Sequence, residues 1–461
     1  MTPQETVERA LQLSTADGCI VVATEGSQAN LRWANNTLTT NGQMRSRKLA
    51  VISIVAGATG AAAGVIERSA VGPDEIESLV RESEAAARSQ GPADDAAPLV
   101  QPWTTDKTWD EAPAETEAAV LGDFARQLGA AFEQARGADR LLYGFADHET
   151  ETAYLGTSTG IRLRHVQPTG KVQLTAKPFD LSGSAWVGAP TRDFRDLDVP
   201  GMLAELDQRL DWQRRKIELP AGRYETILPP SAVADLMLDV YYATSARDAD
   251  EGRTVFSRKG GGSKRGERLS PQPLTLRSDP SYPGLQAAPF LATTSSFSLL
   301  SVFDNGQPNA STAWIQDGVL NQMLCTRAWA AKSEHEAATP VDNLILESAR
   351  PGGGSMEDMI GRTERGLLLT CLWYIRVVDP QTLLVTGLTR DGVYLVENGE
   401  VTGAVNNFRF NESPVELLGR VSEVGDTRIA LAREMNDYFS RTAMPPLRIP
   451  DFNMSTVSQA S

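Results

Sequence analysis

The pattern of helices and strands changes near Pro220, and this change constrains the fold strongly. Before this residue, amphipathic helices alternate with β-rich segments. After it, short strands are separated by turns rich in Gly, Pro, Asn and Ser. A chain of 461 residues is also too long for one hydrophobic core. We therefore predict an α+β protein with an N-terminal α/β domain over residues 1–220 and a β-rich C-terminal domain with few helices over residues 223–455.

In the N-terminal domain, the spacing of apolar residues predicts four helices with β-strands between them. The expected helices are 4–16, 73–89, 115–136 and 200–216, and the expected strands are 19–24, 29–34, 49–56, 140–146, 151–157, 160–166 and 170–178. Residues 90–115 contain four prolines, and Trp103 and Trp109 are their only large apolar anchors. This composition predicts a long Pro-rich excursion over the surface.

In the C-terminal domain, a strand near Tyr224 leads into a helix for which Ser231 is the expected N-cap. The apolar positions of this helix place Asp235 and Asp239 on the opposite side, which we expect to face solvent. A second helix, capped by Ser355, is expected at 355–365. Further strands are expected at 273–277, 296–303, 342–347, 367–377, 383–387 and 392–397.

The charge and cysteine content limit the classes of function. Acidic residues outnumber basic ones by 59 to 44, and a net charge of −15 repels phosphate backbones, so we expect no nucleic-acid partner. Three cysteines without a paired framework indicate a reducing compartment, and we expect a cytoplasmic location. The uncharged stretch 49–66 is rich in Gly and Ala. We interpret it as a strand, a glycine turn and a second element, and therefore expect no membrane association.

His335 and Glu336 resemble half of a zinc-protease signature. The second histidine of such a motif would fall at Thr339 or at Pro340, because both metal ligands must project from one face of a helix. The other histidines, His148 and His165, are too distant in sequence to share a helical turn with it. We therefore expect no catalytic residue and no metal ligand set in this chain. A Cys-His arrangement formed by the fold, or an ion held by carboxylate and backbone oxygens, stays open.

Four blocks of the sequence carry a recognisable pattern. They are LRWANNTLTTNG at 31–42, YETILPPSAVADLML at 224–238, DNLILESARPGGGSMEDMIGRTERGLLLT at 342–370 and LVTGLTRDGVYLVENGEVTGAVNNFRF at 384–410. These blocks resemble the TldD/PmbA family, and they occur in the order found in that family. Together they span nearly the whole chain. The last block is the most specific, since it contains a Thr-Gly, a polar-Arg turn, a strand and an Asn-Gly hairpin in the family's order.

The resemblance implies one of two kinds of subunit. TldD-like members are zinc peptidases with a His-Glu-three-spacer-His motif on the helix after the proline-serine turn and a later cysteine as third ligand, whereas TldE-like (PmbA) members lack these ligands. By register, Asp239 and Thr244 stand at the positions of the two histidines, and Val240 stands at the position of the glutamate. Residues 433–449 cover the region of the third ligand and contain no cysteine. The resemblance thus implies a TldE-like chain without a cofactor, and zinc is expected in a TldD-like partner.

The function implied by the resemblance is that of a non-catalytic subunit of a heterodimeric zinc metallopeptidase, which helps to form a chamber for extended or unfolded peptides. Thr389, Arg390 and Asn398 are the candidate substrate-binding residues. An ordinary salt bridge is the alternative for Arg390, and a hairpin turn is the alternative for Asn398. Two other functions stay open, namely an independent enzyme of the same fold that acts on a modified peptide, and a peptide-binding or assembly module without linked hydrolysis.

Overall fold

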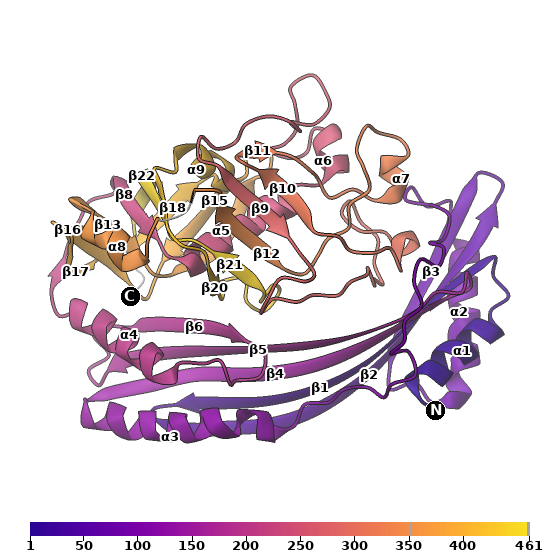
Figure 1. The fold of residues 1–461 in the computed structure, drawn as a ribbon, viewed down its shortest axis with the longest axis horizontal. Coiled ribbons are helices and arrows are strands. Elements are labelled where there is room, and N and C mark those ends of the chain that lie inside the picture. Colours follow the sequence, from indigo (N-terminus) through magenta and orange to yellow (C-terminus); the bar gives the residue numbers. More distant parts are fainter. Residues whose placement is uncertain (351–352, 459–461) are drawn as a thin grey trace.

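The N-terminal half of the chain is built on one long antiparallel sheet, which runs along one side of the molecule (Figure 1). The computed structural model describes residues 1–350 and 353–458, and its two-domain α+β architecture agrees with the predicted fold class. The strand order is β3-β2-β1-β4-β5-β6. These strands are β1 (Gly18–Ala34), β2 (Thr37–Gly57), β3 (Gly60–Ser69), β4 (Arg140–Thr157), β5 (Arg162–Pro178) and β6 (Ala185–Thr191).

The strands of this sheet are longer than the sequence suggests. β1, β4 and β5 each run without a break through a region where the sequence predicts two shorter strands. Those predictions were wrong because polar residues such as Gln28, Glu149 and Gln167 interrupt the apolar alternation, while the backbone hydrogen bonds continue past them. In contrast, the stretch 49–66 forms the end of β2, a turn and most of β3, so the predicted strand and glycine turn are confirmed.

Four α-helices pack on the sheet: α1, α2 and α3 lie on its side away from the C-terminal domain, and α4 lies near its β6 edge beside β17 (Glu400–Val405) (Figure 1). Helices α1 and α2 pack on Cys19, Val21 and Val51 at one end of the sheet. Helices α3 and α4 pack near Leu31 and Leu174 toward the other end. The helices predicted at 4–16, 73–89 and 200–216 are confirmed within four residues, whereas the α-helix predicted at 115–136 begins only at Gly122, after a 3-10 turn. Their bounds are α1 (Pro3–Leu13), α2 (Ile76–Ser89), α3 (Gly122–Gly137) and α4 (Val199–Trp212), and the short 3-10 helices η1 (Pro73–Glu75) and η2 (Ala118–Leu121) precede α2 and α3.

Residues 90–115 cross the surface as turns and extended backbone, as the sequence predicts. Trp109 packs edge-on against Tyr154 of β4, with 5.7 Å between ring centroids. Trp103 reaches the other half of the chain, where its Nε1 donates a hydrogen bond to the carbonyl oxygen of Gly306 at 2.7 Å. The excursion therefore ties the N-terminal sheet to the C-terminal domain.

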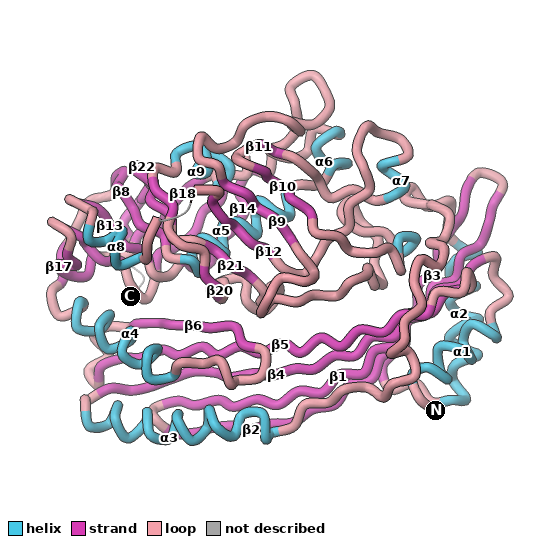
Figure 2. Tube along the Cα trace, in the orientation of Figure 1, coloured by secondary structure: helices cyan, strands magenta, loops and turns pink. Residues whose placement is uncertain are grey.

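The C-terminal domain contains two sheets, joined by many loops (Figure 2). The six-stranded sheet has the order β11-β10-β9-β12-β21-β20, with β9 (Leu274–Ser278), β10 (Thr312–Gln316), β11 (Val319–Leu320), β12 (Leu344–Ser348), β20 (Arg428–Ala430) and β21 (Thr442–Met444). The ten-stranded sheet has the order β14-β15-β18-β22-β8-β13-β16-β17-β7, and β19 pairs with β22. Its strands are β7 (Lys216–Ile217), β8 (Gly222–Leu228), β13 (Arg365–Leu369), β14 (Leu372–Asp379), β15 (Leu384–Thr389), β16 (Val393–Glu397), β17 (Glu400–Val405), β18 (Phe408–Glu412), β19 (Glu423–Val424) and β22 (Leu447–Val457).

Helix α5 (Pro230–Ala243) lies in the core of the C-terminal domain and packs against strands of both sheets. Its N-cap is Pro229, so the predicted cap at Ser231 was wrong; Pro230 occupies the first helical turn, where a missing N–H has no cost. The shorter helices are α6 (Ala246–Asp250), η3 (Val302–Asp304), α7 (Arg327–Ala330), α8 (Met356–Gly361) and α9 (Pro414–Arg420).

Three other predictions for the C-terminal domain need correction. The strand expected at 367–377 is two strands, β13 and β14, because the chain leaves the ladder with β16 after Leu369 and pairs with β15 from Leu372 onward. The strand expected at 296–303 is a loop that ends in η3, because the serine side chains there bond to nearby backbone groups, as Ser301 does to the N–H of Phe303. The helix expected at 355–365 ends at Gly361, and β13 begins at Arg365. Its predicted cap is confirmed, since Ser355 accepts a hydrogen bond from the N–H of Asp358.

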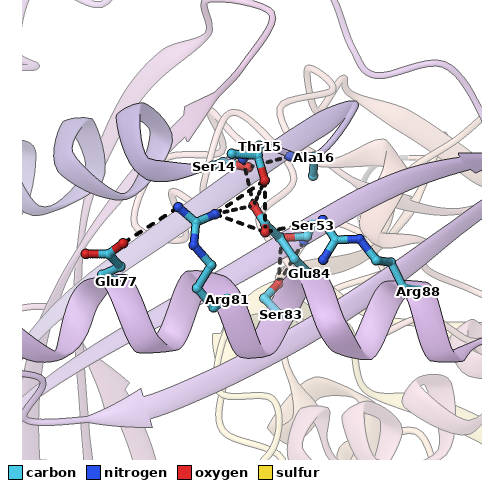
Figure 3. Close-up of polar contacts among 9 residues, drawn as sticks. All are labelled: Ser14, Thr15, Ala16, Ser53, Glu77, Arg81, Ser83, Glu84 and Arg88. Carbon is cyan, nitrogen blue, oxygen red and sulfur yellow. Dashed lines mark hydrogen bonds and ion pairs between the residues drawn. The ribbon is translucent and has the colours of Figure 1, made fainter.

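Two adjacent polar residues of helix α2 fix it to its neighbours: Ser83 bonds to the sheet, and Glu84 bonds to the loop between α1 and β1 (Figure 3). Ser83 Oγ donates toward the carbonyl oxygens of β2 and β3 and accepts a hydrogen bond from the N–H of Ser53 at 3.0 Å. Glu84 is only 1% exposed; it accepts a hydrogen bond from the N–H of Thr15 at 2.6 Å and pairs with Arg81 at 3.0 Å. Gly64 permits this contact, because a Cβ there would lie 2.2 Å from the carbonyl oxygen of Ser83.

We predict that Glu84→Gln destabilises the protein by about 1–3 kcal/mol, because a buried carboxylate loses its charge-assisted contacts with the N–H of Thr15 and with the half-exposed Arg81. Burial raises the pKa of Glu84, but the hydrogen bonds from Thr15 and the pairing with Arg81 lower it overall. The carboxylate therefore stabilises the fold above its ordinary pKa, and this stabilisation is lost as the pH falls through the lower folded value. Urea titrations should show the difference between wild type and variant at neutral pH, and the difference should shrink in acid.

Glu77→Gln is the matched control. Glu77 contacts the same arginine at 3.8 Å, but its side chain is 61% exposed, so its replacement should change the free energy of unfolding by less than about 0.5 kcal/mol. An equal loss in both variants would contradict the importance assigned to the buried contact.

Candidate functional site

The face of the N-terminal sheet that points toward the C-terminal domain is apolar at one end. Here β1, β2, β4 and β5 present a cluster of aliphatic side chains, and Phe290, Val302 and Phe303 of the C-terminal domain cover it. The sheet residues of this cluster are Ile20, Val22, Ala50, Ile52, Ile54, Leu155 and Leu163. The two domains are therefore joined by hydrophobic packing at this end.

The other end of the same face carries an aromatic and cationic stack. The guanidinium of Arg433 lies between two indole rings, 5.0 Å from the ring centroid of Trp186 on β6 and 4.6 Å from that of Trp373 on β14. Cation–π contacts of this kind stabilise by about 0.5–2 kcal/mol each. This stack is a second connection between the N-terminal sheet and the C-terminal domain.

Between these two connections the sheet face is polar, and it does not pack closely against the C-terminal domain. Two cavities of about 160 and 350 Å³ adjoin there, and Gln167, Thr169 and Arg441 line both. We call this pair of cavities the interdomain cleft. Its other wall is formed largely by residues 436–441. We call residues 433–441, which include this wall and the three residues before it, the roof segment.

A few hydrogen bonds cross the cleft and hold the sheet and the roof segment at a fixed separation. Lys171 Nζ on β5 donates to Asn436 Oδ1 at 3.1 Å and pairs with Asp437. Arg441 Nη1 donates to Thr169 Oγ1 at 2.7 Å, and Arg441 also pairs with Asp342. Burial lowers the pKa of Arg441 to about 10, which still leaves it charged at neutral pH.

Three carboxylates on β4 form an acidic row along the cleft. Asp147, Glu149 and Glu151 alternate with residues whose side chains point to the other face of the sheet. The three carboxylates therefore share the face toward the cleft, at a spacing of about 6.8 Å along the strand. Burial raises the pKa of all three, and the neighbouring carboxylate raises the pKa of Glu149 and of Glu151 further. With Lys171 opposite, the cleft offers hydrogen-bonding groups of both charges at the repeat of an extended backbone.

Hydrogen bonds to helix α5 hold the roof segment in place. Asp235 is fully buried, and its carboxyl oxygens accept hydrogen bonds from the N–H groups of Arg433, Glu434 and Met435 at 2.9–3.1 Å. Burial raises the pKa of Asp235 to about 8, although the three donors act to lower it. The prediction that Asp235 faces solvent was therefore wrong, because α5 is buried on nearly all sides and the roof segment covers the side that the apolar pattern leaves polar.

Of the three positions aligned with the zinc motif, Asp239 and Val240 lie in the second half of α5, and Thr244 is the C-cap of this helix. Val240 is fully buried, and Thr244 Oγ1 donates to the carbonyl oxygen of Tyr241 at 2.6 Å. Asp239 is partly buried rather than solvated, and its Oδ2 has no hydrogen-bond partner. Burial raises the pKa of Asp239 to about 6, and the nearby Glu434 carboxylate contributes to the rise.

These side chains do not fit a zinc ion. Zinc sites use imidazole, thiolate and carboxylate ligands, and here only Asp239 offers one of them. Within residues 1–350 and 353–458, no group of three or more His, Cys, Asp or Glu side chains is placed to hold a metal ion. His335 lies in a loop, where its Nε2 is 3.3 Å from Asp250 Oδ1.

The candidate substrate-binding residues do not form one site. Thr389 is buried in the sheet, where its Oγ1 accepts a hydrogen bond from the N–H of Phe408. Arg390 is exposed beside the ring of Trp373 at 5.6 Å. Asn398 and Gly399 both have positive φ in the tight turn between β16 and β17, the conformation expected of an Asn-Gly hairpin. The full length of β16 separates Asn398 from the other two, and a role of all three in substrate binding stays a prediction.

Sequence patterns missed the residues that line the cleft. The row in β4 has a signal, since acidic residues alternate in DHETE, but polar residues on both sides of the strand hide its periodicity. Arg433, Trp186 and Trp373 come from three distant segments, and no local pattern connects them.

A long antiparallel sheet connected at both ends to a β-rich domain, with a polar cleft between them, defines a class of two-domain α+β proteins. The C-terminal half matches the model of the PmbA/TldA metallopeptidase C-terminal domain over residues 221–456, about half of the chain. The chain belongs to the PmbA/TldD family.

Solved structures share the whole architecture. TldE from Thermococcus kodakarensis superposes with a TM-score of 0.79 at 16% sequence identity, over 98% of this chain and 99% of that chain. A putative modulator of DNA gyrase from Thermotoga maritima gives 0.77 at 16% identity, over 98% of this chain and 99% of that chain. One from Bacteroides thetaiotaomicron gives 0.77 at 16% identity, over 99% and 98%. No curated protein sequence matches the chain. Across the described residues, none of the helices has the length and apolar character needed to span a membrane.

We predict that Asp235→Ala frees the roof segment without unfolding the protein as a whole. Three buried N–H groups lose their acceptor, which costs about 2–4 kcal/mol locally. Amide hydrogen exchange at Arg433, Glu434 and Met435 should then become much faster, while exchange in β1 and β4 stays unchanged. Asp123→Ala, on the exposed surface of α3, is the control and should leave all of these amides protected. Unchanged exchange at the three amides in Asp235→Ala would show that other contacts hold the roof segment.

Proposed function

We propose that this chain is the non-catalytic, TldE-like subunit of a TldD/TldE-type zinc metallopeptidase, and that its interdomain cleft helps to hold an extended peptide. The observation that carries the proposal is the chemistry of α5. At the aligned motif positions, a buried valine replaces the general base, and neither imidazole nor thiolate is present. Without these groups a hydrolytic zinc has neither ligands nor a proton acceptor in this chain.

The contact between α5 and the roof segment supports this assignment. In catalytic members, the resemblance implies a zinc ion that joins this helix to a ligand in the region of residues 433–449. In this chain Asp235 joins the same two regions through hydrogen bonds to the N–H groups of residues 433–435. In the proposed function, the carboxyl group of Asp235 therefore keeps the roof segment in position without a metal, and this chain carries out no hydrolysis.

The cleft supports peptide binding. An extended peptide presents N–H and C=O groups at a regular repeat, and side chains of β4 and β5 line the cleft at the same repeat. Contacts to the peptide backbone give affinity with little dependence on sequence.

A surface for a partner subunit is available at the edge of the C-terminal domain. β14 is the outermost strand at one end of the ten-stranded sheet, and it exposes Tyr374, Val377 and Val378 by 48–59%. Edge strands with exposed apolar side chains are typical of surfaces that pair with another chain.

Affinity capture from the native cell extract tests the proposal. The tagged chain should bring down a TldD-like paralogue with bound zinc in equal amount, and the pair should hydrolyse an unstructured peptide until a chelator removes the metal. The chain alone should bind no stoichiometric zinc and should leave the peptide intact. Stoichiometric zinc and peptidase activity in the isolated chain would refute the proposal.

One observation favours a second candidate, an independent enzyme of the same fold. A carboxyl group with a pKa of about 6, such as that of Asp239, can transfer protons near neutral pH. In that case the isolated chain would turn over a modified peptide in the presence of a chelator, and Asp239→Asn would abolish turnover. If the isolated chain shows no turnover with or without zinc, this candidate is excluded.

A further inference from the structure

The guanidinium of Arg433 lacks a hydrogen-bond acceptor. Its Nε is buried without a partner, and within the described part of the chain no carboxylate or carbonyl oxygen contacts its terminal nitrogens. The guanidinium lies 5.0 and 4.6 Å from the ring centroids of Trp186 and Trp373, and neither indole ring offers an acceptor oxygen to its N–H donors. A buried donor without an acceptor is costly, so this arrangement suits an acceptor supplied by a ligand.

A second arginine lies on Trp373. Arg390 is 5.6 Å from the ring centroid, and half of its side chain is exposed. Its nearest acid is Asp391, at 3.9 Å, and Asp391 also accepts a hydrogen bond from Ser184. Trp373 therefore holds two guanidinium groups.

The charges around Trp373 do not balance. Arg376 is paired with Glu434 at 3.2 Å, and Asp391 lies 3.9 Å from Arg390. Among the described residues Arg433 has no ion-pair partner; the carboxyl of Asp235 contacts only its backbone N–H, and burial raises the pKa of Asp235 to about 8, so this carboxyl is largely uncharged at neutral pH. The local excess of positive charge favours an anion.

This cationic site adjoins the interdomain cleft. Trp186 Nε1 donates to Gln173 Oε1 at 3.3 Å, and Gln173 Nε2 donates to Asn436 Oδ1 at 3.0 Å in the cleft wall. The acidic row of β4 lies on the far side of Lys171 from the arginines. A peptide along the cleft would therefore have its ammonium end near carboxylates and its carboxylate end near Arg433.

We propose that Arg433 and Arg390, held by Trp186 and Trp373, form a subsite for a carboxylate of the extended peptide, either its C-terminus or an acidic side chain. This inference rests on the proposed function only in that the chain binds peptides; it does not depend on zinc or on the partner. The planar guanidinium forms paired hydrogen bonds with a carboxylate, and these charge-assisted bonds are stronger than those to an amide.

Peptide binding to the full chain tests the subsite. The probes are a fluorescently labelled, unstructured peptide with a free C-terminal carboxylate, the same peptide with a C-terminal amide, and the amide peptide with one internal Glu. In fluorescence anisotropy titrations, the carboxylate peptide should bind the wild type about tenfold more tightly than the amide peptide, because a charge-assisted hydrogen bond is lost. Tight binding of the Glu-containing amide would identify an acidic side chain as the ligand, and weak binding would identify the C-terminus.

Three variants separate the subsite from a merely structural role. Arg390→Gln and Arg433→Gln should each reduce the preference for carboxylate over amide toward one, with little change for the amide peptide. Because Arg390 is half exposed, its variant should fold even if Arg433→Gln does not. Arg365→Gln, whose side chain is 65% exposed on β13, is the control and should keep the preference. Equal binding of all three peptides to the wild type, an unchanged preference in Arg390→Gln, or no binding of any probe would overturn the subsite. Capture of the zinc-bearing paralogue is measured in a separate experiment, so that failure of the subsite can be distinguished from failure of the proposed function.

Discussion

The interdomain cleft depends on one buried carboxyl group. Asp235 on α5 accepts hydrogen bonds from three consecutive N–H groups of the roof segment, and no regular secondary structure holds residues 433–438. Arg433 enters the stack with Trp186 and Trp373 from this same short segment, and Asn436 meets Lys171 from it. The wall of the cleft and the second connection between the domains thus share one anchor in the core of the C-terminal domain.

In the proposed function, that anchor explains how a chain of this family can keep its cleft without a metal. Buried hydrogen bonds give helix α5 and the roof segment a fixed geometry. The surface proposed to face a peptide is therefore maintained although the aligned positions of α5 carry neither imidazole nor thiolate, as the proposed division of labour between two subunits requires.

Local patterns predict the parts of this fold in which one face of an element is buried. The helices on the N-terminal sheet, the buried strand β16 and the Asn398-Gly399 turn follow from apolar spacing and turn chemistry. The same logic failed for Asp235, because α5 is buried on nearly all sides, and for β4, because its polar residues face a cleft inside the molecule. Contacts such as that between Arg433 and Trp186 join segments far apart in the chain, and only the folded structure reveals them.

The apolar end of the N-terminal sheet has a consequence for synthesis of the protein. Phe290, Val302 and Phe303 cover this end, and Trp103 finds its hydrogen-bond partner at Gly306. Translation releases the sheet long before these residues, so the nascent chain carries an uncovered aliphatic surface on the ribosome. Long-range contacts of this kind also slow folding. Until residues 290–306 have been synthesised, this aliphatic surface has no partner within its own chain and is exposed to aggregation with other chains.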